Sequence, residues 1–367
     1  MGTAMKTQTL NVGLVGYGMA AKTFHAPLIQ AAPGLELTSV VSSDADKVLR
    51  DLPDVTVHAK LNELLEVRHV DLIVIATPNE QHYAMAKAAL AAGKHVVVDK
   101  PITVSASEAR QLRAQADRSE LLLSVFHNRR WDCDFLTVRK LLEQGRLGRV
   151  TSFTSRFDRY RPAVNNRWRE QHKPGGGIWY DLGPHLLDQA RELFGMPRAI
   201  LLELASSRDG AEVDDDFLAL LEYDRLRVTL QASSLVAEPS PRFVVHGTEG
   251  SYSIYGLDPQ EGWLKQGLTP SEDWGVDDAP GQLTLNRGSA EEPDLVSEEW
   301  LSEPGNYPAF YAAVAQTLLH GDPPPVSGEQ AVDVMTLLEA GLDSYRQGRW
   351  VRLKEGNSNL RRLHARR

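Results

Sequence analysis

The sequence contains very little cysteine. Cys133 is the only cysteine among 367 residues, which excludes an intrachain disulfide and an all-cysteine zinc site. Such usage is typical of proteins from a reducing compartment, so we expect a cytoplasmic location. We expect Cys133 itself to be a small buried hydrophobe in a helix, and the sequence assigns it no chemical role.

Long apolar runs are also absent. No stretch approaches the ~20 apolar residues that span a bilayer. The first nine residues, MGTAMKTQT, have no apolar core of signal-peptide length. Lys6 stands where an N-myristoylation signal requires Ser or Thr. We therefore expect no membrane partner, and we expect the natural start to be Met5 rather than Met1.

Positive charge is in short supply. Lys and Arg total 40 against 49 Asp and Glu, a formal net charge of −9. Binding to nucleic acid or to a membrane surface needs a basic face, so we expect neither partner. The exception is the tail after Leu353, which we interpret as a solvated end. Its basic residues are Lys354, Arg361, Arg362, Arg366 and Arg367.

Internal repeats and long low-complexity segments are missing too. A composition of 42% hydrophobic and 24% charged residues is typical of a soluble globular protein. The length exceeds that of one ordinary domain of ~150 residues, which predicts two domains. We place them at residues 1–130 and 131–367, with the last residues as a candidate to pack back on the first domain.

Apolar runs and helical patterns alternate over the first third of the chain. Near-continuous Val, Ile and Leu strands separated by helices indicate a parallel sheet covered on both faces. We therefore expect an α/β, doubly wound first domain. Its expected strands are 11–15, 35–41, 71–76, 95–98 and 121–126.

After Gly148 the strands become longer and alternate between apolar and polar residues, which suits an antiparallel sheet with one face packed. The second domain is therefore expected to be α+β, with a mostly antiparallel sheet and helices over 307–319 and 329–345. Residues 267–304, rich in Gly, Pro, Asp and Glu, are expected to form surface connections. The expected strands are 150–158, 199–204, 217–223, 226–232 and 243–246.

A glycine-rich turn, Gly16-Tyr17-Gly18-Met19-Ala20-Ala21, closes the first strand and opens the first helix. Its glycines permit a tight turn and close approach of the backbone to a pyrophosphate, while the helix start supplies N–H groups. Gly-x-Gly-x-x-Ala alone is a weak signal. At the first turn of a βαβ pattern it predicts a Rossmann dinucleotide site.

The end of the second expected strand bears on the choice between NAD and NADP. The acid that usually binds the NAD ribose is not clearly present after Val41, where Ser42, Ser43 and Asp44 follow. The two serines stand in place of the carboxylate that would repel a 2′-phosphate, and this favours NADP slightly. Asp44 either reaches the ribose hydroxyls or caps the next helix, and both options stay open.

Asp99-Lys100-Pro101 ends the strand that begins at His95, at the sheet edge where open α/β folds bind ligands. The proline disfavours helix for Lys100 and fixes the exit of the chain. A lysine at this edge can hydrogen-bond a reacting hydroxyl and stabilise a developing alkoxide. Without the glycine-rich turn, an ordinary exposed lysine would be the better interpretation.

A second stretch of interest runs from Gly175 to Asp188, GGGIWYDLGPHLLD. Helical spacing after Pro184 predicts a helix from near Gly183, which would place His185 at its positive end. There the imidazole, with an ordinary pKa of about 6.5, would stay neutral and able to act as a base. The alternative is that Asp181 is an N-cap and His185 lies on a polar surface, and this stretch alone does not decide.

A metal hydrolase that uses Asp181, His185 and Asp188 is a third interpretation of the same stretch. A closed set of ligands is hard to assemble from one helical turn, and no His-x-x-x-His or cysteine pair accompanies it. We therefore expect no metal.

Four motifs together resemble the Gfo/Idh/MocA oxidoreductases, and they span nearly the whole chain. They are the Gly16 turn, Ala76-Thr77-Pro78 with His82, Asp99-Lys100-Pro101 in place of the common Glu-Lys-Pro, and Gly175-Gly-Gly-x-x-x-Asp181-x-x-x-His185. Within that family, four segments resemble the bacterial scyllo-inositol dehydrogenase branch. These are 127–132, 159–162, 167–170 and 255–261.

The resemblance implies a nicotinamide Rossmann domain and a substrate domain whose open sheet mediates dimers or tetramers. It also implies a catalytic set of Lys100, Asp181 and His185. His185 would be the base and Lys100 the electrostatic partner, while Asp181 holds the substrate hydroxyl or orients the histidine. Asp99 in place of glutamate keeps the charge but shortens the reach, which leaves the role of that side chain open.

The expected reaction is NAD(P)-dependent oxidation of a cyclic polyol, most simply scyllo-inositol, with another sugar or a non-catalytic dinucleotide sensor as alternatives. The expected cofactor residues are Gly16, Tyr17, Gly18, Met19, Ala20, Ser42, Ser43, Asp44, Thr77, Pro78, Asn79, His82, Asp99, Lys100 and Asn128. The expected substrate residues are Lys100, Arg129, Asp158, Tyr160, Arg161, Trp168, Asp181 and His185.

Overall fold

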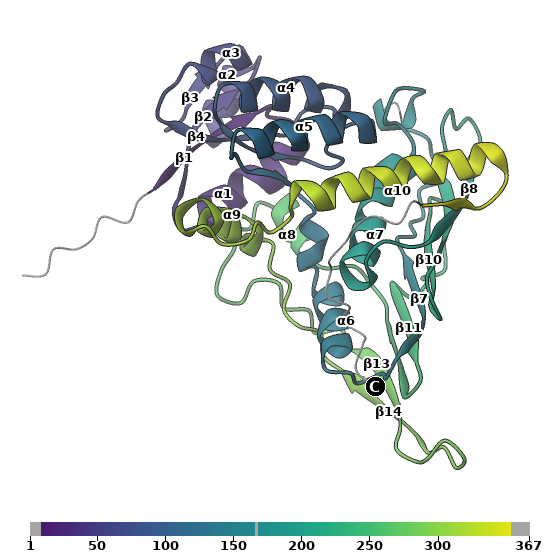
Figure 1. Ribbon diagram of the computed structural model, residues 1–367. Coiled ribbons are helices and arrows are strands. Elements are labelled where there is room, and N and C mark those ends of the chain that lie inside the picture. The colour runs from purple at the N-terminus through teal and green to yellow at the C-terminus, as the bar shows by residue number, and fades with distance from the viewer. Residues whose placement is uncertain (1–8, 166–167, 354–367) are drawn as a thin grey trace, which may run out of the picture. The chain divides into compact units, whose positions relative to one another are not determined.

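The computed structural model describes residues 9–165 and 168–353 (Figure 1). The expectations for Met5, Lys6 and the basic residues from Lys354 onward lie outside these residues. The described chain divides into two compact units. Unit 1 contains the residues up to Asn128 together with Gln260–Trp274 and Asn306–Val332, and unit 2 contains Arg129–Pro259, Gly275–Gly305 and the residues from Asp333.

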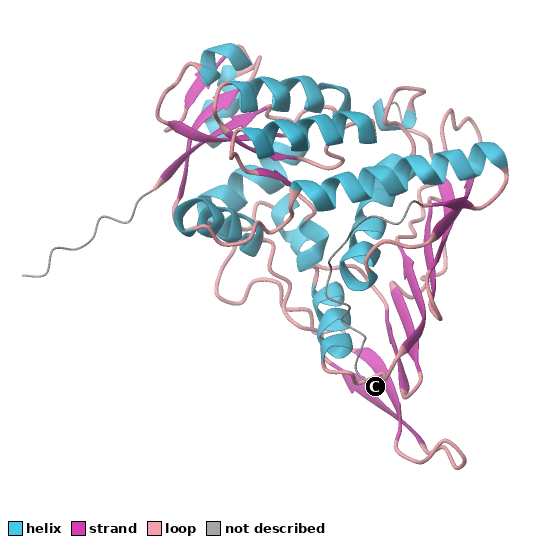
Figure 2. Cartoon of the chain, in the orientation of Figure 1, coloured by secondary structure: helices cyan, strands magenta, loops and turns pink. Residues whose placement is uncertain are grey.

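Unit 1 is built on a parallel sheet of six strands in the order β3-β2-β1-β4-β5-β6. Its strands are β1 (Leu10–Val15), β2 (Leu35–Val41), β3 (Thr56–His58), β4 (Val70–Ile75), β5 (His95–Val98) and β6 (Leu123–Val125). Helices pack on the sheet (Figure 2), which confirms the expected α/β class. They are η1 (Ala21–His25), α1 (Ala26–Ala31), α2 (Ala45–Asp51), α3 (Leu61–Leu65), α4 (Asn79–Ala91) and α5 (Ala106–Arg118).

The core of unit 1 follows from its strand sequences. Strand β4 reads VDLIVI and β5 reads HVVV, and their apolar residues are buried. A strand covered by helices on both faces loses the polar alternation of an exposed strand, which is why these runs are continuous. The sequence pattern did not indicate β3 and α3, which are only 3 and 5 residues long.

Unit 2 is built on nine strands in the order β14-β13-β12-β11-β7-β10-β9-β8-β15. The pairs are antiparallel except β7 with β10, which confirms a mostly antiparallel sheet. The strands are β7 (Val150–Arg156), β8 (Ala199–Ala205), β9 (Asp216–Glu222), β10 (Arg227–Ser233), β11 (Phe243–Gly247), β12 (Gly250–Ile254), β13 (Gly281–Asn286), β14 (Leu295–Trp300) and β15 (Val351–Arg352).

The helix α7 (Ile178–Phe194) packs on one face of this sheet against β9 and β10. The strands alternate between buried and half-exposed residues, as in DFLALLE of β9. The other main helices are α6 (Cys133–Glu143) in unit 2, α9 (Pro308–His320) in unit 1, and α10 (Gly328–Gln347), which begins in unit 1 and continues into unit 2. Cys133 is buried at the start of α6, as expected. Among residues 9–165 and 168–353, no helix combines the length and apolar character needed to cross a membrane.

One expectation for the second half of the chain was wrong. Residues 267–304 are not only surface connections, because β13 and β14 lie within them. Strand β14 reads LVSEEW and is exposed at the sheet edge, so it lacks the alternation that reveals a half-buried strand. Unit 2 is not one continuous stretch, because Gln260–Trp274, with helix α8 (Gln260–Lys265), and Asn306–Val332 belong to unit 1.

Candidate functional site

The glycine-rich turn lies between β1 and the first helical turn of unit 1. Gly16 has a φ of 91°, and a Cβ there would lie 2.9 Å from the carbonyl oxygen of Ala76, so a side chain is excluded twice over. A Cβ at Gly18 would meet nothing within 4 Å, and Lys22 N already donates to Gly18 O at 3.0 Å. A tight turn followed by open space at a helix start fits the pyrophosphate of a dinucleotide.

The side chain of Tyr17 is buried and hydrogen-bonded. Its hydroxyl donates to Asp51 Oδ2 at 3.3 Å, and Asp51 in turn pairs with Lys22 Nζ at 2.8 Å. Burial, together with the negative charge of Asp51, raises the pKa of Tyr17 to about 12. Only the backbone of Tyr17 is therefore expected to contact the dinucleotide. Met19, in contrast, is 57% exposed.

Asp44 caps the helix after β2, which confirms one of its two expected roles. Its Oδ1 accepts a hydrogen bond from Lys47 N at 2.9 Å, and Ser42 Oγ accepts one from Asp44 N at 3.1 Å. Lys47, which the sequence analysis did not single out, reaches back with Nζ to donate to Tyr17 O at 2.9 Å. Lys47 thus links the segment after β2 to the glycine-rich turn, with its backbone N–H on Asp44 and its ammonium on Tyr17 O.

Asp99 and Lys100 follow β5 directly, at its carboxyl end. Asp99 is 9% exposed, and its Oδ1 accepts a hydrogen bond from Lys100 N at 2.8 Å and lies 3.9 Å from His25 Nε2. Burial alone would raise the pKa of Asp99. The neighbouring His25, with smaller contributions from the charges of Lys100 and His82, outweighs it and lowers that pKa to about 2. Asp99 is thus a buried carboxylate ion.

His82 lies on α4 and is fully buried between two backbone carbonyls. Its Nδ1 is 2.8 Å from Pro101 O and its Nε2 is 2.8 Å from Thr77 O. A neutral ring donates to one of these oxygens, and a protonated ring donates to both. Burial lowers the pKa of His82, while the Asp99 carboxylate and the two carbonyls oppose that shift. His82 therefore joins the segments that follow β4 and β5.

In unit 2, α7 begins at Ile178 and not near Gly183, so the expected helix start was wrong. Gly177 has a φ of 91°, and a Cβ there would collide with the Asp214 carboxylate. Asp214 caps the helix, because Trp179 N donates to its Oδ2 at 2.7 Å and Ile178 N to its carbonyl at 2.9 Å. Asp214 is distant in sequence and not part of the motif, so spacing gave no signal for it.

This earlier start changes the environment of His185. It is the eighth residue of α7, beyond the first turn to which the helix-end potential is confined, so the expected argument from the positive end does not hold. His185 is instead 5% exposed, so the surface alternative was also wrong. Asp181 lies one turn before it, on the same side of the helix, and is not the N-cap. Arg169 Nε lies 3.5 Å from Asp181 Oδ1.

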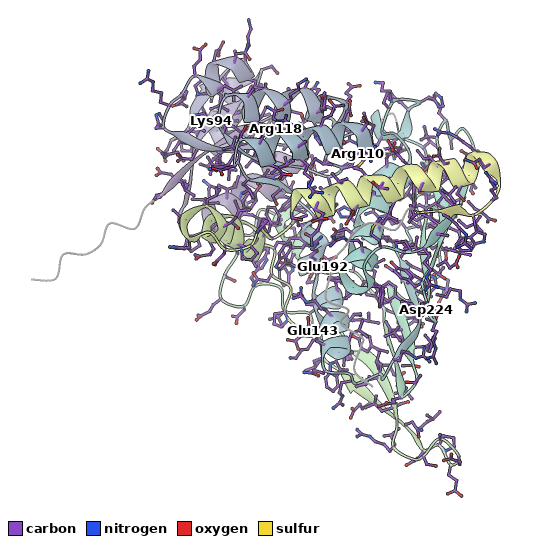
Figure 3. The ribbon with its side chains drawn as sticks, in the orientation of Figure 1. Lys94, Arg110, Arg118, Glu143, Glu192 and Asp224 are labelled. Carbon is purple, nitrogen blue, oxygen red and sulfur yellow. The ribbon has the colours of Figure 1, made fainter. Side chains whose placement is uncertain are left out.

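The remaining polar residues of α7 serve packing. Asp188 accepts two hydrogen bonds from Arg130, from Nε at 2.8 Å and Nη2 at 2.7 Å. Glu192, which Figure 3 labels on α7, lies 3.1 Å from Arg130 Nη1. The Asp188 carboxylate is therefore paired with Arg130, which argues against its use as a metal ligand in a hydrolase. Among the residues that the structure describes, no group of three His, Cys, Asp or Glu is placed to hold a metal ion.

The other expected substrate residues lie in varied surroundings. Arg129 is buried, with Nη1 3.3 Å from Asp132 Oδ2 and its guanidinium 4.5 Å from the centre of the Phe157 ring. Burial raises the pKa of Asp158, and the charge of Arg156 opposes that shift. Tyr160 and Arg161 are exposed. The side chain of Trp168 lies outside the described part of the chain, and its role stays a prediction.

Unit 1 brings several expected cofactor residues together. A Cβ on Gly16 would lie 3.1 Å from Thr77 Cγ2, and His82 joins Thr77 to Pro101. The segments after β1, β4 and β5 therefore form one contiguous group. Asn79 and Asn128 are buried. In unit 2, Asp181, His185 and Arg169 form the second group of candidate residues.

Two family profiles match the chain. One, described as an oxidoreductase family with an NAD-binding Rossmann fold, matches residues 10–127. The other, the C-terminal alpha/beta domain of the same oxidoreductase family, matches residues 139–353. Residues 128–138 lie between the two matches.

Two curated proteins are similar to the chain over nearly their full length. The uncharacterized oxidoreductase YdgJ of Escherichia coli K12 is 53% identical over 339 residues, 92% of this chain and 97% of the relative. The scyllo-inositol 2-dehydrogenase (NADP(+)) IolW of Bacillus subtilis 168 is 38% identical over 352 residues, 95% of this chain and 97% of the relative.

Solved structures give the same result for the fold. A putative oxidoreductase from Yersinia pestis has a TM-score of 0.91 at 49% identity, covering 95% of this chain and 99% of that one. The putative oxidoreductase yvaA from Bacillus subtilis has a TM-score of 0.92 at 37% identity, covering 96% and 100%.

Proposed function

Because the chain belongs to the Gfo/Idh/MocA family of oxidoreductases, which act on CH–OH groups, we propose that it oxidises a cyclic polyol. The proposed substrate is scyllo-inositol, the product is the keto-inositol, and the reaction is reversible. The observation that carries this proposal is the 38% identity, across 95% of the chain, to a scyllo-inositol 2-dehydrogenase.

The chemistry requires that a hydroxyl lose its proton as its carbon loses hydride. A base near the oxygen and a cation to stabilise partial alkoxide lower that barrier. In the proposal, a neutral His185 takes the proton at a ring nitrogen, and the Lys100 ammonium stabilises the oxygen. Asp181, one helical turn from His185, accepts a hydrogen bond from the substrate hydroxyl or orients the imidazole. A bound nicotinamide supplies the hydride acceptor.

The support for the three residues differs. Asp181 and His185 share one side of α7, and His185 is shielded from solvent. Lys100 stands at the carboxyl end of β5, the sheet edge that binds ligands in such folds. The grouping of Lys100 with the α7 pair comes from the family resemblance, and mutagenesis has to test it.

We propose that NADP is the preferred cofactor. Ser42 and Ser43 place hydroxyls, not a carboxylate, after β2, and the carboxylate of Asp44 is engaged as a helix cap. Lys47 adds a positive charge beside the same turn, where it already contacts Tyr17 O. Hydroxyl donors with a nearby cation suit a 2′-phosphate. The named relative IolW is an NADP(+) enzyme, in line with this choice.

We propose further that a second copy of the chain covers the outer face of the unit 2 sheet, in a homodimer or homotetramer. Leu201, Leu220, Thr229, Thr154 and Val244 pair in one row across five strands and are half-exposed. Their neighbours along each strand point the other way and are buried. Light scattering, which measures the molecular mass in solution, tests this proposal on wild type and Leu220→Arg. An unchanged mass in Leu220→Arg would argue against this face as the contact between copies.

The function is tested by following nicotinamide reduction in absorbance with scyllo-inositol, myo-inositol and several aldoses, each with NAD and NADP. Wild type should turn over scyllo-inositol, and His185→Ala should lose about 100-fold or more in kcat while still binding the dinucleotide. His320→Ala, at the exposed end of α9, is the matched control and should retain activity. Turnover of an aldose alone would assign a sugar substrate, and dinucleotide binding without any turnover would favour a sensor.

A further inference from the structure

Three fully buried polar side chains lie next to Asp99 and Lys100 in unit 1. They are His25, His82 and Tyr311, each 0% exposed. A buried polar group costs free energy unless it is hydrogen-bonded, so such a group is retained where its bonds hold something in place or where it acts. Their contacts show what these three side chains hold.

His25 connects Asp99 to the helix that follows the glycine-rich turn. It ends the π-helical segment η1, a rare conformation that recurs at functional sites. Its Nδ1 lies 2.6 Å from the Tyr311 hydroxyl on α9, and its Nε2 lies 3.9 Å from Asp99 Oδ1. The ring also packs on Phe126, with ring centres 4.5 Å apart. Tyr311 and Phe126 thus fix the orientation of the ring toward Asp99.

His82 acts on the other side of the lysine. Asp99, held by His25, receives the hydrogen bond of Lys100 N at 2.8 Å. Pro101, the residue after Lys100, presents its carbonyl to His82 at 2.8 Å, and the second nitrogen of that ring faces Thr77 O. Both neighbours of Lys100 in the chain are therefore anchored, one through His25 and one through His82.

We propose that His25 and His82 are positioning residues that set the place of the Lys100 side chain relative to the glycine-rich turn. The inference rests on the proposed function, in which Lys100 stabilises the reacting oxygen. His25 follows the turn on the same helical segment, and Thr77 lies against Gly16. The lysine and the segment expected to hold the dinucleotide are thus linked through two fully buried side chains.

The test compares His82→Leu, His82→Gln and Tyr311→Phe with wild type. Displacement of a catalytic group by about 1 Å can cost about 100-fold in rate, so we expect His82→Leu to lower kcat about 10- to 100-fold. The KM and the dinucleotide Kd should stay within about threefold, because the binding groups are unchanged. His82→Gln keeps an N–H donor and should recover part of kcat. Tyr311→Phe should cost less than His82→Leu.

Lys94→Met is the matched control. Lys94, labelled in Figure 3, is also a buried polar residue of unit 1, and its Nζ donates to Val67 O at 3.0 Å and Val70 O at 2.7 Å. These carbonyls lie just before and at the start of β4, away from its carboxyl end. Its loss should lower Tm and leave kcat unchanged. Equal losses of kcat in Lys94→Met and His82→Leu would mean that His82 serves stability alone.

A second readout needs no turnover. The rate at which an amine-acylating reagent modifies Lys100, followed by mass spectrometry, should rise in His82→Leu and stay unchanged in Lys94→Met. If Lys100→Met is inactive while His82→Leu keeps both wild-type kcat and the wild-type labelling rate, the positioning role is wrong. If Lys100→Met retains wild-type kcat, the proposed function of Lys100 fails, and the labelling rate still reports whether His82 positions that side chain.

Discussion

Arg130 holds Asp188 by two hydrogen bonds, from Nε to Oδ2 at 2.8 Å and from Nη2 to Oδ1 at 2.7 Å, with both side chains at most 4% exposed. The polar residues of α7 that follow Asp181 and His185 are therefore occupied inside unit 2. This separates the motif into two parts. Asp181 and His185 are candidates for chemistry, whereas Asp188 fixes the helix.

Breaking this pair should destabilise the protein strongly. Arg130→Met leaves Asp188 as a buried charge without its guanidinium, and removal of one partner of a buried pair costs about 3–5 kcal/mol. The free energy of unfolding from urea denaturation measures the effect. Arg346→Met removes the exposed pair with Asp343 on α10 and should cost less than about 1 kcal/mol. Equal effects of the two substitutions would contradict the buried role.

The two glycines of the turn should respond differently to alanine. Gly16→Ala meets both a positive φ and the carbonyl of Ala76, so it should lower stability by about 1–3 kcal/mol and abolish dinucleotide binding. Gly18→Ala fills open space and should leave unfolding unchanged while weakening dinucleotide affinity. Calorimetric titration with NADP measures the dinucleotide affinity of both variants. A Gly18→Ala protein with wild-type affinity would place the pyrophosphate elsewhere.

Lys47 should contribute to cofactor choice. A hydrogen bond to a charged group contributes about 1.5–3 kcal/mol, so Lys47→Met should weaken NADP binding about 10- to 100-fold and change NAD binding little. Ser42→Asp should add like-charge repulsion toward a 2′-phosphate and move the preference toward NAD. The ratio of kcat/KM for the two cofactors is the measurement. Equal losses for both cofactors in Lys47→Met would show that the lysine supports the turn and does not select the phosphate.

Asp99 should make stability depend on pH. Because its folded pKa is lowered to about 2, its contribution is fully present above the unfolded pKa of about 4 and is lost as the pH falls toward 2. The difference in unfolding free energy between wild type and Asp99→Asn should therefore shrink by up to about 2 kcal/mol over that range. Urea denaturation at a series of acidic pH values checks this. A difference that stays constant with pH would mean that the carboxylate gains nothing from its surroundings.

The local features of the fold were predictable from the sequence. The glycine-rich turn, the strands of unit 1 other than β3, and the position of Lys100 after β5 depend on neighbouring residues, and periodicity and turn chemistry reveal them. The start of α7 was not predictable in this way. It depends on Asp214, which lies more than thirty residues beyond Gly177 and caps the helix from the loop before β9.

The group around Asp99 was beyond sequence reasoning for the same physical cause. Tyr311 contacts His25 across 286 positions of the chain, and neither residue belongs to a motif. His82 was noticed only through the resemblance, as an expected cofactor residue. Its burial between Thr77 O and Pro101 O depends on how the ends of β4 and β5 lie, which periodicity does not encode.

The division of unit 1 into three stretches of chain also affects how the protein is made. Tyr311, the partner of His25, belongs to the last of these stretches, Asn306–Val332. A ribosome therefore synthesises the whole of Arg129–Pro259 before it reaches the last two stretches of unit 1. Domains otherwise tend to fold in order of synthesis. Here the residues up to Asn128 leave the ribosome well before Tyr311, so His25 lacks that partner until the chain is nearly finished.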